Sequence, residues 1–182
     1  MKKSSTHWVL WVLYIISWII FVGLGIEAGS FLTNAVFALV KPEAVKYLWK
    51  QVDLTNLLQY DRIHFFVVAL VLTIVSVLKA VLFYTIIRLL HKKKVSWSQP
   101  FNQTLVNFVN TAAAITLLIG IFCNSVMNYT HWLERNGVNM PQIHELHFDG
   151  GDVWLFMAII LFIIAQVFKK GIEIQTENEL TV

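Results

Sequence analysis

The sequence predicts an all-α integral membrane protein, in which a bundle of four membrane-spanning helices places both termini in the cytoplasm. Composition is the first observation: 57% of the 182 residues are hydrophobic, 14% are charged and the mean hydropathy is +0.65, unlike soluble domains. The second is a series of four apolar runs, since about 20 apolar residues in a helix cross a hydrocarbon core of ~30 Å. The short fourth run spans if its flanking side chains reach the interfaces.

The whole chain is expected to form one membrane domain, residues 1–182. Its first outer loop should carry short amphipathic helices, because the apolar residues there recur at helical spacing. The predicted spans are residues 8–27, 63–90, 101–127 and 153–168, the outer loops are residues 41–62 and 129–152, and the cytoplasmic tail is residues 171–182.

The first run carries no charge from Trp8 to Ile26, and its helix can continue to residue 40 before Pro42 stops it. A secretory signal peptide is the alternative, because two lysines precede the run. However, the run exceeds the usual apolar stretch of ~7–15 residues and lacks a small-x-small cleavage site, so we expect a retained anchor.

Orientation follows from the basic end of the second run, which carries Arg88, His91 and the lysines at 92–94. Positive side chains are retained on the cytoplasmic side during insertion. With both termini inside, eight Lys and Arg residues flank the inner ends of the spans and five flank the outer ends. The chain is therefore predicted to cross the membrane several times with both termini in the cytoplasm.

Polar residues follow one stripe of the third run. Their spacing alternates between three and four residues, as on one helix face. Amides in hydrocarbon need partners, so we expect this face to look into the bundle, where residues 112–114 and Gly120 permit close helix approach. The stripe consists of Gln103, Asn107, Asn110, Ala114, Leu117, Ile121, Asn124 and Asn128.

Lys79 is an ionisable residue inside the second span, where such groups usually mark function. Counting at ~1.5 Å per residue from the polar end of each run places Lys79 level with several small polar residues and excludes Glu27 as a direct partner. Such a layer can bind a small anion or carry a proton; the alternative is a structural lysine that bonds to amides or reaches the interface. The predicted layer is Lys79, Ser17, Ser76, Asn107 and Asn110.

The second outer loop is rich in histidine and acidic residues, which are suitable zinc ligands. The histidines are not spaced as in an HExxH helix, so a solvated loop whose histidines only titrate is the alternative. Haem needs axial ligands on facing helices, and His64 is the sole histidine well placed for it. We therefore expect no cofactor, with zinc or a similar ion as the alternative, held by His144, His147, His131, Asp149 and Asp152.

Pro100 and Phe101 open the third run, and the chain ends in a Gln-x-Glu-Asn-x-Leu-Thr-Val motif. These stretches resemble a bacterial family of four-span membrane proteins of unknown function, whose carboxyl end reads Leu-Gln-x-Glu-Asn-Asp-Leu-Thr-Val. The departures from that pattern are Ile174 and Glu179. The resemblance implies four spans and brings no catalytic residues. Because members often lie beside small helix-turn-helix regulators, it also implies a regulatory pairing. Since the family is bacterial, the resemblance makes the inner (cytoplasmic) membrane the expected location.

The carboxyl tail alternates acidic and apolar side chains and is too short to fold alone. We expect it to dock on an inner loop of this protein or on a cytoplasmic partner, with a short solvated tail as the alternative. The predicted partner-binding residues are Gln175, Glu177, Asn178, Leu180, Thr181 and Val182.

These observations favour a small regulatory or sensory membrane protein that presents its tail and basic inner loops to a cytoplasmic partner, such as a transcription regulator. The alternatives are a small solute or ion carrier that uses the Lys79 layer and a metal-responsive protein that uses the outer histidines. No enzyme is expected, because the chain lacks a nucleophile with a base, an acid pair in the membrane and a phosphate loop. Direct nucleic-acid binding is not expected either, since the basic residues sit mostly at the ends of apolar runs. Self-association stays open.

Overall fold

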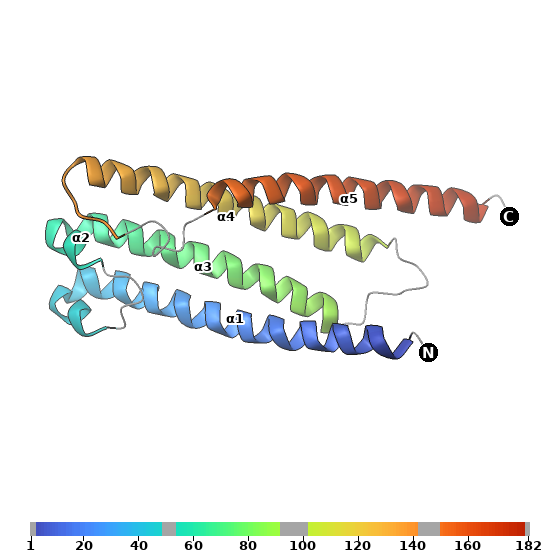
Figure 1. Ribbon diagram of the computed structural model, residues 1–182, viewed down its shortest axis with the longest axis horizontal. Helices are drawn as coiled ribbons and strands as arrows, with labels where there is room; N and C mark the ends of the chain where they lie inside the picture. Colours follow the sequence, from blue (N-terminus) through green and yellow to red (C-terminus); the bar gives the residue numbers. More distant parts are fainter. Residues whose placement is uncertain (1–2, 49–53, 92–101, 142–149, 181–182) are drawn as a thin grey trace.

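The computed structural model describes residues 3–48, 54–91, 102–141 and 150–180, and this part of the chain is helical with short connections (Figure 1). Four helices are long, and two short helical segments lie between the first and second of them. The elements are α1 (Lys3–Val40), the 3-10 helix η1 (Pro42–Tyr47), α2 (Thr55–Tyr60), α3 (Arg62–His91), α4 (Gln103–Arg135) and α5 (Gly151–Leu180).

The four long helices are apolar enough to cross a membrane. The most apolar 18-residue stretch of each has a mean hydropathy of 2.5 in α1, 2.7 in α3, 2.0 in α4 and 2.2 in α5. A helix satisfies its own backbone hydrogen bonds, which a lipid-exposed segment must do because the hydrocarbon offers no partners. The predicted all-α class and the four apolar helices are confirmed, and the chain has the build of a multi-pass membrane protein.

The long helices form an open row in the order α1, α3, α4, α5 (Figure 1). α1 packs along α3, α5 packs along α4, and a less extensive interface joins α3 to α4. The two edge helices therefore have one principal neighbour each. Both chain termini lie at one end of the row, here called the terminal end, while η1 and α2 lie at the opposite, distal end.

The face of α1 that packs on α3 repeats every seven residues. Its buried and half-buried side chains alternate at spacings of three and four, which is the pattern of two helices packed side by side. Small side chains at several of these positions permit close approach of the two backbones. The repeat comprises Tyr14, Ser17, Phe21, Leu24, Ala28, Phe31, Ala35 and Ala38.

Two ring contacts fix the register between α1 and α3. The ring of Tyr14 stacks on His91, with its hydroxyl 3.3 Å from Nδ1, and Phe21 lies beside Tyr84 with ring centroids 6.0 Å apart. The two helices are therefore antiparallel and in step: a residue seven positions later on α1 is level with a residue seven positions earlier on α3. Because Tyr14 is level with the last residue of α3, the first eleven residues of α1 extend beyond α3, over about 16 Å.

Glycines set the register between α4 and α5. A Cβ atom on Gly120 would lie 2.8 Å from the side chain of Leu155, and one on Gly151 would lie 3.2 Å from the backbone nitrogen of Asn124. The predicted close approach at Gly120 is therefore present. Counting along both helices from these contacts makes Gln103, the first residue of α4, level with about residue 172 of α5.

The segment predicted as a tail, residues 171–182, is helical as far as Leu180 and continues α5 without a break. About eight residues of α5 therefore project beyond the start of α4 at the terminal end (Figure 1). At its own start, α4 is capped by Asn102, whose side-chain oxygen accepts a hydrogen bond from the backbone nitrogen of Leu105 at 2.9 Å.

The polar stripe of α4 does not look into a bundle, so that prediction is wrong. Most of its side chains, including Asn107, Asn124 and Asn128, are exposed, and Asn110 is half-buried. The reason is the open row: α4 contacts α3 and α5 through other faces, and no fourth helix covers the stripe. Part of the amide hydrogen bonding is met locally, because Gln103 Nε2 donates to Asn107 Oδ1 at 2.9 Å.

We predict that Gly120→Leu lowers the melting temperature of the purified protein in detergent, because its side chain would overlap Leu155. Forced packing of this kind typically costs about 1–3 kcal/mol. Gly25→Leu is the matched control, since no atom lies within 4 Å of a Cβ atom built there. Equal melting temperatures for the two variants would contradict the α4–α5 packing.

Candidate functional site

Lys79 lies half-buried on α3, with the buried Ser76 less than one turn away. The rest of the predicted polar layer lies at a different level. Ser17 is level with Arg88 by the α1–α3 register, about 14 Å from Lys79 along the helix axis, and its hydroxyl donates to the carbonyl of Leu13 at 2.7 Å.

The two predicted amides belong to the terminal end as well. Asn107 lines a pocket together with Arg88, and Asn110 lies one turn further along α4. The structure thus keeps Lys79 and Ser76 together and places the other three residues nearer the terminal end, Asn110 by about one to two turns. Counting from the polar end of each run failed because the helices are staggered: α1 starts far beyond the end of α3.

The same stagger brings Glu27 to the depth of Lys79, so the exclusion of Glu27 is incorrect. Lys79 is five residues before Tyr84, which makes it level with the residue five after Phe21, next to Glu27. Both side chains are half-buried, and they lie on α1 and α3, which pack on each other through the seven-residue repeat of α1. Because a carboxylate and an ammonium group attract each other when they come close in a low-dielectric layer, Glu27 is a candidate partner of Lys79.

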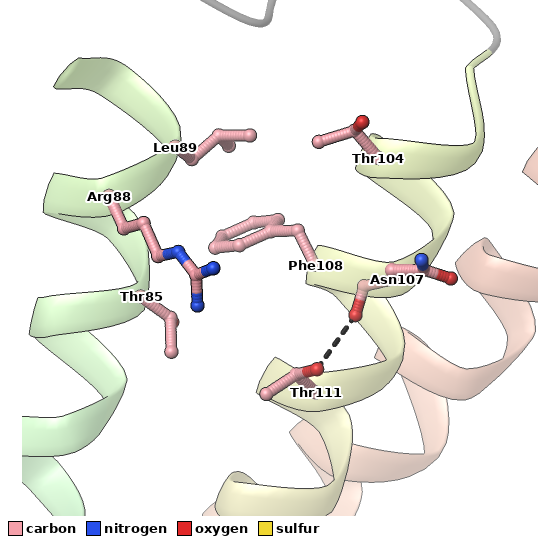
Figure 2. Close-up of a pocket in the computed structure, with 7 residues that line it drawn as sticks. All are labelled: Thr85, Arg88, Leu89, Thr104, Asn107, Phe108 and Thr111. Atoms are coloured by element: carbon pink, nitrogen blue, oxygen red, sulfur yellow. Dashed lines mark hydrogen bonds between the residues drawn. The ribbon is translucent and has the colours of Figure 1, made fainter. Parts of the chain in front are cut away.

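A pocket of about 260 Å³ lies between α3 and α4 at the terminal end, here called the Arg88 pocket (Figure 2). Two of its hydroxyl groups are used within their own helices: Thr85 donates to the carbonyl of Leu82 at 2.7 Å and Thr111 to that of Asn107 at 2.8 Å. The lining residues are Thr85, Arg88, Leu89, Thr104, Asn107, Phe108 and Thr111.

Arg88 supplies the charge of this pocket. Figure 2 shows its side chain extending from α3 towards Phe108 of α4. Its guanidinium group is exposed and, within the described part of the chain, has no hydrogen-bond or ion-pair partner. No acidic residue lines the pocket. In the sequence, Arg88 indicated only the orientation of the chain. The signal that could have indicated this pocket is the set of polar residues on both sides of the α3–α4 connection.

An aromatic and polar cluster joins α2, α3 and α4 at the distal end. Nδ1 of His64 lies 2.5 Å from the hydroxyl oxygen of Tyr129, and the rings of Tyr60 and Trp132 flank the imidazole. Asp61 directly precedes α3 and caps it: its Oδ1 accepts hydrogen bonds from the backbone nitrogens of Ile63 and His64, at 2.6 and 3.0 Å. The bond from His64 N–H is the main cause that lowers the pKa of Asp61.

The predicted metal site is covered only in part. His144, His147 and Asp149 lie outside the described residues. His131 is exposed on α4 and pairs with Glu134 at 3.1 Å, whereas Asp152 is at the start of α5, level with the middle of α4. Within the described ranges, no three His, Cys, Asp or Glu side chains gather in a way that suits a metal ion.

The predicted partner-binding residues fall on the projecting end of α5. Gln175 and Glu177 lie on this helix, in which Lys170 Nζ and Glu173 Oε2 form an ion pair at 2.9 Å. Asn178 and Leu180 belong to the helix, although their side chains are not among those described, and Thr181 and Val182 lie outside the described residues.

Comparison of the chain with protein-family models, with curated proteins and with solved structures finds no match. The fold and the apolar helices define the class, a multi-pass helical membrane protein.

We predict that Glu27 and Lys79 are energetically coupled. Glu27→Gln and Lys79→Met should each lower the melting temperature in detergent, because each leaves the other charge at mid-membrane depth. The double variant should recover part of the loss, with a coupling of about 1 kcal/mol. Lys41→Met with Glu43→Gln, an exposed pair on a neighbouring segment, is the additive control. Additive losses for Glu27 and Lys79 would contradict the coupling.

The lowered pKa of Asp61 predicts a pH dependence of stability. A carboxyl whose pKa falls below its ordinary 3.8 on folding stabilises the folded state above that pH, and the contribution is lost as the pH falls through the lowered value. Wild type should therefore exceed Asp61→Asn in melting temperature near neutral pH, and the difference should shrink below about pH 4. A constant difference across this range would count against an ionised cap.

Proposed function

We propose that the protein is a small regulatory or sensory protein of the inner (cytoplasmic) membrane, whose terminal end is cytoplasmic and binds a soluble partner there. A transcription regulator is the first candidate for that partner. One observation carries the proposal: α5 continues as a helix for about eight residues beyond the start of α4, and packs mainly on α4 before it does so.

The projecting part of α5 has the chemistry of a docking helix. Glu173, Ile174 and Glu177 are exposed, so an apolar side chain stands between acidic ones. A helix that is already formed loses little conformational entropy when it enters a groove on a partner. A groove lined by apolar and basic residues would complement this surface.

The charge distribution supports the orientation. Arg88 and His91 in the last turn of α3 and the pair Lys169 and Lys170 on α5 are at the terminal end, as the positive-inside rule requires of a cytoplasmic end. The carboxyl end also resembles a family often found beside helix-turn-helix regulators, and this resemblance supports a regulatory partner in the cytoplasm.

The carrier hypothesis loses the observation on which it depended, because Ser17, Asn107 and Asn110 lie away from Lys79 along the helix axes. The metal-responsive hypothesis rests on a loop that lies largely outside the described residues. The regulatory function is therefore the one that the arrangement of the helices favours.

We predict that a photo-crosslinking amino acid at Thr176, exposed on the projecting end of α5, forms an adduct with a soluble cytoplasmic protein in living cells. The same probe at Asn139, exposed at the distal end, should not. Glu173→Gln combined with Glu177→Gln should reduce the adduct, if acidic residues contribute to docking. An adduct with the same protein from both positions, or adducts only with membrane lipid, would contradict the proposal.

A further inference from the structure

We infer that the Arg88 pocket binds a phosphate group, carried by an anionic phospholipid headgroup or by inorganic phosphate. The pocket is distinct from the projecting end of α5, and this inference does not depend on the regulatory function proposed above. It rests on the charge, the hydrogen-bond donors and the shape of the pocket.

The charge of the pocket is positive and uncompensated. Among the described residues, Arg88 is the one charged residue of the lining, and it has no ion-pair partner there. Thr104 lies in the first turn of α4, where the helix dipole favours an anion.

The donors suit phosphate in particular. A guanidinium group presents several N–H donors in a planar fork that matches two phosphate oxygens. Thr85 and Thr111 already donate to backbone carbonyls, which leaves Thr104 as the lining hydroxyl group best able to donate to a ligand. Arg88 and Thr104 come from two different helices and lie on either side of the Phe108 ring (Figure 2), so a ligand whose phosphate binds Arg88 and whose neighbouring polar atoms reach Thr104 would bridge α3 and α4.

The shape of the pocket accommodates more than a free ion. Its volume of about 260 Å³ includes an apolar part lined by Leu89 and Phe108, next to the polar part (Figure 2). A phospholipid has this combination, since its phosphodiester adjoins a glycerol backbone and acyl chains. Asn107 and Arg88 are both exposed, so the pocket is reached from the surface of the α3–α4 pair.

The test is the melting temperature of the full-length protein in a zwitterionic detergent, titrated with phosphatidylglycerol, with phosphatidylcholine or with inorganic phosphate. Phosphatidylglycerol should raise the melting temperature of wild type, and phosphatidylcholine should raise it less. If inorganic phosphate reproduces the shift, free phosphate is the ligand; if only the lipid does, the headgroup is. No shift with either source of phosphate would overturn the inference.

Variants assign the effect to the pocket. Arg88→Gln should weaken the apparent affinity by about tenfold or more, as expected when a charged hydrogen bond is lost. Arg88→Lys should retain part of it, and Thr104→Val provides a second test that keeps the charge. Arg62→Gln, an exposed arginine at the distal end of the same helix, should bind as wild type does. An unchanged affinity in both Arg88→Gln and Thr104→Val would overturn the inference.

Discussion

The register between α1 and α3 determines which polar side chains of these two helices lie at the same depth. It is set by a seven-residue repeat on α1 and by the contacts of Tyr14 and Phe21 with α3. Because α1 is staggered by about eleven residues relative to α3, Glu27 reaches the depth of Lys79 and Ser17 does not. A shift of one heptad would keep the same faces in contact but would move Glu27 by about 10 Å along the axis. Close packing around small residues is what prevents such a shift.

The open row explains the distribution of exposure. The central helices α3 and α4 each have neighbours on two sides, whereas α1 and α5 expose large apolar side chains over much of their length, as lipid-facing helices do. The same geometry leaves the amide stripe of α4 uncovered and opens the Arg88 pocket to the surface. Features that would be interior in a closed bundle are therefore accessible.

The number and type of the long helices could be predicted from the apolar runs, because a run of about 20 apolar residues without charge usually forms a membrane-spanning helix. The Gly120 contact was also predictable, since glycine in an apolar helix permits close approach. The layer around Lys79 was not, because relative depth depends on which side chains interlock across an interface, and the polar ends of the runs do not reveal the stagger. The Arg88 pocket needed the same information: Arg88 and Thr104 line one pocket only because α4 begins at its Asn102 cap beside the last turns of α3.

The one-sided packing of α5 has a mechanical consequence. A helix held mainly along one neighbour behaves as a lever, and the tight contact of Leu155 with Gly120 is a natural fulcrum. From Leu155 to Leu180 the arm is about 37 Å long, so a tilt of about 10° would carry its free end through about 6 Å. A small tilt of α5 against α4 would thereby become a displacement as large as a side chain at the projecting end of α5, beyond the residues that pack on α4.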